Sequence, residues 1–279
     1  MSIHTDSPQR PYWHVDAKWI TGLLLFLTLS VTFLAFNLWQ VTAAEPGINA
    51  LTLLLASAFS PEGLDSEADI ALMQEQLQAS STGEIQPVPG LRITIHAEEI
   101  AGLSPREVRL FFFRQWAEPL YYQGAAGLAE LVDDPAMRQS IEEGIGPLAL
   151  LSAQSHQQLL PVWIGLALLD LLLILLLIVF SYRFGRLSSP GCVLFLTALP
   201  AAALLALVRQ SLLNQLATAP STGESLSARL LSLVVTALPG LLDLILRNYL
   251  IVAAVGLGLI LLALLGSLFW PQRRQPAGN

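Results

Sequence analysis

The chain has 279 residues, of which 54% are hydrophobic and only 13% are charged, and its formal net charge is −7. A soluble domain carries about 25% charged residues, and here the shortfall is concentrated in long apolar runs, which indicates an integral membrane protein. The acidic balance argues against a nucleic-acid partner, and the single cysteine, Cys192, excludes an intramolecular disulfide.

Four apolar runs are long enough to cross a bilayer as helices. A hydrocarbon core of about 30 Å requires roughly 20 helical residues, and a helix satisfies its backbone hydrogen bonds within the segment. The predicted spans are residues 19–42, 159–182, 191–208 and 249–270. Tryptophan or tyrosine lies near both ends of three of them, as is typical of membrane interfaces.

The segment 209–248, between the third and fourth spans, contains a further apolar stretch at 226–246. Arg229, Pro239 and Asp243 interrupt this stretch, and its uncharged part is too short to span a bilayer. We interpret it as a broken amphipathic or re-entrant helix at the interface. The alternative is a fifth span, which would move the C-terminus to the other side of the membrane.

Basic residues near the spans predict the orientation, because the cytoplasmic side retains them. With four spans, one side holds both tails (1–18 and 271–279) and the short loop 183–190, with six basic residues: Arg10, Lys18, Arg183, Arg186, Arg273 and Arg274. The other side holds residues 43–158, with sixteen acidic residues and five arginines. We therefore expect a multi-pass plasma-membrane protein with cytoplasmic termini and residues 43–158 outside.

The first apolar run has a second interpretation. Val41, Thr42 and Ala43 resemble a signal-peptidase site, with small residues at the usual positions. The run is longer than a signal core of about 7–15 residues, and the residues before it carry no net positive charge. An uncleaved anchor is the prediction, and cleavage would remove one span while leaving the remaining topology unchanged.

Within residues 43–158 we predict a mostly helical domain with a small β-hairpin. Residues 91–97 alternate between apolar and polar side chains, which is typical of a half-buried strand, and residues 84–88 are its expected partner. Ser104, Pro105 and Glu107 combine a capping serine, a proline at the first helical position and a glutamate three residues after the serine. The fold class is therefore an all-α membrane bundle with a helical extracytoplasmic domain.

The helix that begins at Ser104 carries an apolar stripe that includes Phe111, Phe112 and Trp116 at helical spacing. One interpretation is packing in the core of the domain. The other is a surface that binds a protein partner or the membrane.

Asp170 lies near the middle of the second span, where an ionised carboxylate costs several kcal/mol unless it is paired or hydrated. No lysine or arginine occurs at a matching depth, so the expected partners are hydroxyl groups: Thr28, Ser30, Thr32 and Thr197. Asp170 is then either a neutral, hydrogen-bonded group that holds helices together or a proton or cation site in a conduit.

Two further patterns concern packing and metal binding. Ala254 and Gly258 lie four residues apart in the fourth span and predict close packing against another helix or a second copy of the chain. His96 lies near Glu98 and Glu99, but the ordinary interpretation is a solvated strand end. The four histidines are otherwise scattered, so we expect no metal and no cofactor.

The sequence contains none of the common metalloprotease, P-loop, nucleophile-elbow or dinucleotide-binding motifs. These patterns favour a non-enzymatic membrane protein whose outer domain binds or organises a partner, either another protein or a second copy. The first alternative is a transport or permeation component that uses Asp170. The second is a membrane-bound enzyme, because catalytic groups meet in space rather than in sequence.

Overall fold

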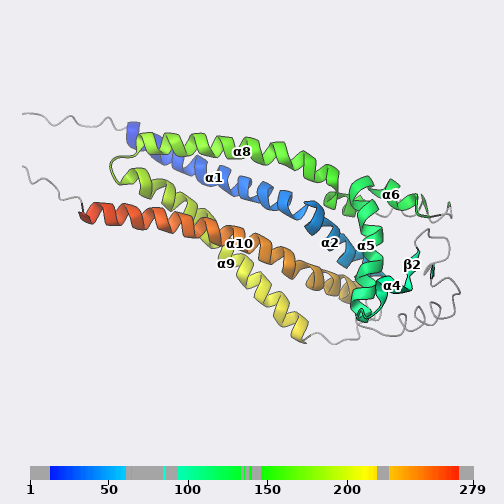
Figure 1. Cartoon of the computed structure of the whole chain (residues 1–279). Helices are drawn as coiled ribbons and strands as arrows, with labels where there is room; N and C mark the ends of the chain where they lie inside the picture. Colours follow the sequence, from blue (N-terminus) through cyan, green and yellow to red (C-terminus); the bar gives the residue numbers. More distant parts are fainter. Residues whose placement is uncertain are drawn as a thin grey trace, which may run out of the picture. The chain divides into compact units, whose positions relative to one another are not determined.

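The computed structural model describes residues 13–60, 64, 84–85, 94–132, 135, 138–139, 146–218 and 226–269. The described chain is mostly helical (Figure 1). Four of its helices contain segments long and apolar enough to cross a membrane: α1 (Trp13–Val41), α8 (Ala153–Phe180), Gly185–Asn214 of α9 (Gly185–Thr218) and Gly240–Phe269 of α10 (Leu226–Phe269). The prediction of four helices with the length and composition of membrane spans is confirmed.

The helix α10 differs from the expectation of a break before the fourth span. It is continuous over 44 residues, which corresponds to about 66 Å and exceeds the hydrocarbon core of about 30 Å. Residues 241–250 are rich in leucine, a strong helix former, and contain no glycine or proline. The backbone of α10 therefore continues through Arg229, Pro239 and Asp243, the three residues that were expected to interrupt it.

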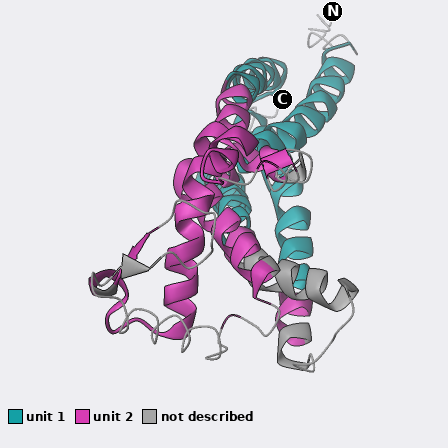
Figure 2. Ribbon diagram, turned by 90° about the vertical axis from the view of Figure 1, so that its right-hand side faces the viewer, with its two compact units in different colours: residues 1–37, 161–208, 243–279 teal, residues 38–160, 209–242 magenta. Residues whose placement is uncertain are grey.

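Contacts divide the chain into two compact units (Figure 2). Unit 1 comprises residues 1–37, 161–208 and 243–279, and unit 2 comprises residues 38–160 and 209–242. Unit 1 contains most of each span, and unit 2 contains the segments that connect the first span to the second and the third to the fourth. Each unit is described by itself below.

Unit 1 is a helical bundle that contains a cluster of buried leucines. Leu25 and Leu29 of α1 pack against Leu173 and Leu177 of α8, and all four side chains are buried. Many apolar side chains point outward instead; Leu34, Leu172 and Leu262 are 58%, 53% and 60% exposed. Such a surface is unfavourable in water and ordinary in lipid, which agrees with a membrane location.

The turn between α8 and α9 is short. Helix α8 ends at Phe180, α9 begins at Gly185, and the backbone of Arg183 is left-handed, with φ of 44°. This conformation costs a residue other than glycine roughly 1 kcal/mol or more. The turn nevertheless closes compactly, because the backbone N–H of Gly185 donates to the carbonyl of Tyr182 over 2.8 Å.

Unit 2 is built around two helices, α2 (Ala44–Phe59) and α5 (Pro105–Gln123), which pack against each other. Unit 2 also contains the short elements α4 (Ala97–Ile100), α6 (Ala125–Ala129) and η1 (Gly146–Leu151), two short strands, and the adjoining ends of α1, α8, α9 and α10. Its core includes aliphatic and aromatic side chains from both long helices, among them Leu51, Leu55, Val108, Phe112, Phe113, Trp116, Leu120 and Tyr121.

Two local predictions in unit 2 can be compared with the structure. The strands β1 (Glu84–Ile85) and β2 (Ile95–His96) pair antiparallel, with Glu84 opposite His96; the residues that connect them lie outside the described part of the chain. The helix α5 begins where the sequence indicates. The Ser104 hydroxyl accepts from the backbone N–H of Glu107, and the Glu107 carboxylate accepts from the backbone N–H of Ser104. The Ser104 hydroxyl also donates to the Glu107 carboxylate over 2.7 Å. This bond, followed by the one from the Ser104 backbone N–H, holds the pKa of Glu107 below its usual range.

Candidate functional site

Asp170 is buried in unit 1, with a side chain 4% exposed. Its Oδ2 lies 2.5 Å from the Oγ1 of Thr32 on α1, which is also buried. The packing of the leucine faces of α1 and α8 brings Thr32 and Asp170 together. Thr32 lies on the buried face of α1, one turn beyond Leu29. Of the four hydroxyl groups considered from the sequence, the structure brings Thr32 to Asp170.

The hydrogens at this site can be counted. The single hydroxyl hydrogen of Thr32 faces two oxygens, Asp170 Oδ2 and the backbone carbonyl of Thr28, which lies 2.9 Å away. If Asp170 is ionised, one hydrogen must serve both acceptors. If Asp170 is neutral, its own O–H donates to Thr32, and the Thr32 hydroxyl donates to Thr28. The geometry therefore accommodates a neutral carboxyl group with every hydrogen used.

The second carboxyl oxygen is the unusual feature of the site. Asp170 Oδ1 is buried and has no hydrogen-bond partner among the described residues. A buried, unsatisfied oxygen is unfavourable and calls for an explanation. The neighbouring side chains, such as Leu173 and Phe33, are apolar. Within the described part of the chain, no group of three or more His, Cys, Asp or Glu residues could hold a metal ion, so the site lacks the ligand set of a cation cage.

A second buried polar contact in unit 1 was not predicted from the sequence. The Nδ2 of Asn248 on α10 donates to the Oδ1 of Asn37 on α1 over 2.7 Å, and Asn37 is 4% exposed. The available signal was an asparagine inside an otherwise apolar span. Together with Thr32, this contact means that α1 forms hydrogen bonds with both α8 and α10.

Close helix packing uses different small residues from those expected. A methyl group on Gly191 of α9 would lie 2.9 Å from the carbonyl oxygen of Gly256, and one on Gly256 of α10 would lie 2.7 Å from the backbone nitrogen of Phe195. The predicted pair behaves otherwise: a methyl group on Gly258 would meet nothing within 4 Å, and Ala254 is exposed. The contact between α9 and α10 therefore depends on Gly191 and Gly256.

The aromatic stripe of α5 lies mostly inside unit 2. Phe112 and Trp116 are 7% and 5% exposed, and Phe111 is partly buried against the same core. Phe59 at the end of α2 stacks on Phe113, with ring centroids 5.8 Å apart, yet it is 58% exposed. The accessible edge of this aromatic cluster is thus Phe59, which the helical periodicity of α5 could not reveal.

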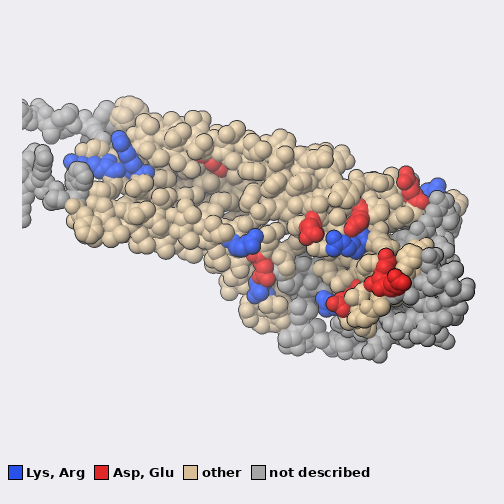
Figure 3. All heavy atoms as spheres, viewed as in Figure 1, with Lys and Arg blue, Asp and Glu red and all other residues tan. Residues whose placement is uncertain are grey.

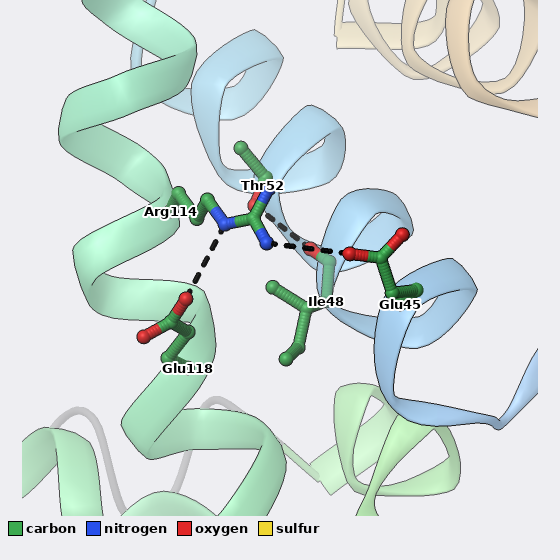
Figure 4. A network of polar contacts seen from close by, with 5 residues as sticks. All are labelled: Glu45, Ile48, Thr52, Arg114 and Glu118. Atoms are coloured by element: carbon green, nitrogen blue, oxygen red, sulfur yellow. Dashed lines mark hydrogen bonds and ion pairs between the residues drawn. The ribbon is translucent and has the colours of Figure 1, made fainter.

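The interface between α2 and α5 combines exposed charge with buried hydrogen bonding. Arg114 contacts Glu118 at 3.3 Å and Glu45 at 3.8 Å (Figure 4). Pairs this exposed contribute little to stability. The Tyr121 hydroxyl is buried and donates to the backbone carbonyl of Thr42 over 2.8 Å. Burial raises the pKa of Tyr121, and the neighbouring Tyr122 adds to this effect.

The histidines of unit 2 have structural contacts. His156 donates from Nδ1 to the carbonyl oxygen of Trp39 over 2.9 Å, and its ring stacks on the Trp39 ring. The backbone N–H of His96 donates to Glu99, which caps the short helix α4. The Glu99 carboxylate considered for a cation site with His96 is thus engaged in a helix cap.

No family model, curated protein or solved structure matches the chain. Any function must therefore be inferred from the residues and contacts described above.

Proposed function

We propose that the chain is a non-enzymatic, multi-pass plasma-membrane protein whose unit 2 lies outside the cytoplasm and binds or organises a partner. The proposal rests on which segments of the chain make up unit 2. This unit contains residues 38–160 and residues 209–242. A four-span topology with cytoplasmic termini assigns these two segments to the same side of the membrane. Unit 2 also has a hydrophobic core of its own.

The chemistry of the described part of unit 2 is suited to binding. Its core is apolar and aromatic, and Arg114 of α5 pairs at the surface with Glu118 and with Glu45 of α2 (Figure 4). Phe59 offers an exposed ring that rests on a buried aromatic cluster. Exposed aromatic side chains supported in this way are common anchors in protein interfaces, so we place the partner surface at Phe59, whose ring contacts those of Phe113 and Trp116.

A photocrosslinking experiment tests this function in intact cells. A photoreactive phenylalanine analogue replaces Phe59 in the full-length chain, and the control places it at Tyr122, an exposed aromatic position of the same unit. We expect a discrete adduct from position 59 and none of that mass from position 122. An adduct of twice the chain mass identifies a second copy, and another mass identifies a different protein. Absence of any discrete adduct at position 59 would overturn the proposal.

One observation favours a second function, passage of a proton through unit 1 by way of Asp170. The unpartnered Oδ1 provides an acceptor that a proton or a water molecule could reach during opening of the bundle. In proteoliposomes with a pH-sensitive dye inside, the wild-type chain is then expected to equilibrate an imposed pH difference faster than empty vesicles, and Asp170→Asn is expected to abolish the excess. Equal rates for the two chains would exclude Asp170 from this role.

A further inference from the structure

The turn between α8 and α9 carries two arginines, Arg183 and Arg186. Arg183 and Arg186 are exposed, and neither forms an ion pair with a carboxylate in the described part of the chain. The Arg183 guanidinium lies 5.1 Å from the centroid of the Tyr182 ring, and the Nε of Arg186 lies 3.5 Å from the carbonyl of buried Ser181. The two cations are thus positioned by contacts with neutral groups.

The turn lies at the end of the bundle of unit 1. It connects two helices that each have the length and composition of a span, so its side chains stand at the depth of the lipid headgroups. The start of α1 lies beside it, because the ring centroid of Trp13 is 6.2 Å from that of Phe180. Lys18 follows Trp13 on the next turns of α1 and brings a third positive charge to this end. The one acidic residue described on this part of α1 is the exposed Asp16.

The space-filling view agrees with this arrangement. Figure 3 shows basic side chains gathered at one end of the long helices, followed by a surface along the bundle that is tan apart from one small acidic patch. A long apolar surface that ends in cations complements an anionic phospholipid, whose acyl chains lie along the helices while its phosphate meets the arginines. Arginine presents a planar fork of N–H donors that matches phosphate oxygens.

The backbone of Arg183 adds a separate argument. Its left-handed conformation would be accommodated best by glycine, so the position carries a side chain at a conformational cost. The α9 amides do not supply an alternative anion site, because the N–H groups of Gly185, Arg186 and Leu187 already donate within the turn. Recognition of an anion here therefore depends on the guanidinium groups.

We propose that Arg183 and Arg186 bind the phosphate of an anionic phospholipid at this end of unit 1, where Lys18 adds to the positive charge. The occupant is a membrane lipid rather than free phosphate, because the site lies between two spans and the adjoining surface is apolar. The proposal depends on the membrane location of unit 1 and is independent of the partner surface proposed for unit 2.

Native mass spectrometry of the full-length protein in detergent tests the site. Delipidated protein is titrated with phosphatidylglycerol or phosphatidylcholine of the same chain length. We expect wild-type protein to prefer phosphatidylglycerol by about tenfold, and Arg183→Gln with Arg186→Gln to reduce this preference to below about threefold. Arg114→Gln removes an exposed arginine of unit 2 and is the matched control, in which the preference should be unchanged.

Further measurements keep the proposal falsifiable if the double variant does not fold. In the wild-type protein, the preference should decline as ammonium acetate is raised, since exposed charges are screened by salt. The single variant Arg183→Gly removes the conformational cost of a left-handed backbone at this position, and it should still weaken the preference for phosphatidylglycerol because it removes a guanidinium group. A preference that survives the double variant, that ignores salt, or that disappears equally in Arg114→Gln would overturn the proposal. Complete displacement of the lipid by equimolar inorganic phosphate would overturn the assignment to a lipid.

Discussion

The buried carboxyl group of Asp170 on α8 meets the hydroxyl group of Thr32 on α1. The cost of an intramembrane carboxylate predicts that a hydroxyl group must meet it, and four candidates are evident from the sequence. The choice of Thr32 depends on the rotation of α1 about its axis, which is set by the packing of Leu25 and Leu29 against α8. That rotation is a property of two helices together, so the sequence of either one alone could not identify the partner.

The contribution of this contact can be measured with a valine substitution. Thr32→Val removes the hydrogen bond to Asp170 while keeping the side-chain shape, and it leaves a buried carboxyl group without its partner. We expect the free energy of unfolding to fall by about 1–2 kcal/mol, measured by reversible unfolding in mixed detergent. Thr28→Val is the control, because the Thr28 hydroxyl bonds only to carbonyls of its own helix. Equal effects of the two substitutions would mean that the contact between helices contributes nothing.

Tyr121 gives a prediction with a defined dependence on pH. Its buried hydroxyl donates to Thr42, and burial raises its pKa above the ordinary value. The unfolded chain releases this proton near pH 10, while the folded chain retains it. The stabilisation is therefore complete below about pH 10 and is lost as the pH rises through the raised pKa.

The test compares Tyr121→Phe with Tyr122→Phe, since Tyr122 is 61% exposed. We expect Tyr121→Phe to lower the free energy of unfolding at pH 7 by about 1 kcal/mol and to flatten its alkaline decline, as followed by denaturant titration at several pH values. An unchanged alkaline decline in Tyr121→Phe would contradict the assignment to this residue.

At the scale of elements, the sequence predicts a helix end correctly where that end depends on hydrogen bonds between residues close in the chain. The start of α5 follows from Ser104 and Glu107, whose side chains satisfy each other's backbone amides. The continuity of α10 was missed because the charges of Arg229 and Asp243 and the proline at position 239 indicated a break, whereas the helix continues past all three. Spacing in one helix indicates a small-residue face, but the neighbouring helix decides which glycine it meets: α9 packs against Gly256, and packing of Ala254 and Gly258 against a second copy of the chain stays a prediction.

A pair of alanine substitutions in α10 tests this assignment. Gly256→Ala introduces a methyl group against the backbone of α9, which has no room to yield, so we expect destabilisation of about 1–3 kcal/mol. Gly258→Ala meets open space and replaces glycine with a better helix former, so stability should be unchanged or higher. Thermal unfolding in detergent reports both changes. The reverse ranking would show that the second helix packs against Ala254 and Gly258.

At the scale of the molecule, the presence of four helices long and apolar enough to cross a membrane could be anticipated from apolar length alone. The interior of unit 2 could not, because its core joins α2 to α5 across a long sequence separation, and periodicity in α5 does not identify what covers Trp116. The exposure of Phe59 likewise depends on that tertiary arrangement.

The proposed orientation is testable because the chain has one natural cysteine. With Cys192→Ser as background, Glu130→Cys places a thiol on the exposed surface of unit 2, and Tyr182→Cys places one at the turn between α8 and α9. We expect a membrane-impermeant maleimide to label position 130 in intact cells and to label position 182 only after permeabilisation. The opposite pattern would invert the topology, and labelling at both positions in intact cells would contradict it.

The buried polar contacts of α1 have a consequence for biosynthesis. Thr32 meets Asp170 138 residues later in the chain, and Asn37 meets Asn248 211 residues later. At about 5–20 residues per second, a ribosome needs roughly 7–28 s and 10–40 s to supply these partners. Until α10 has been synthesised, α1 therefore lies in the bilayer without the hydrogen bond between Asn37 and Asn248. A nascent chain stalled before α10 would expose Asn37 to any quality-control factor that recognises polar side chains in membrane helices.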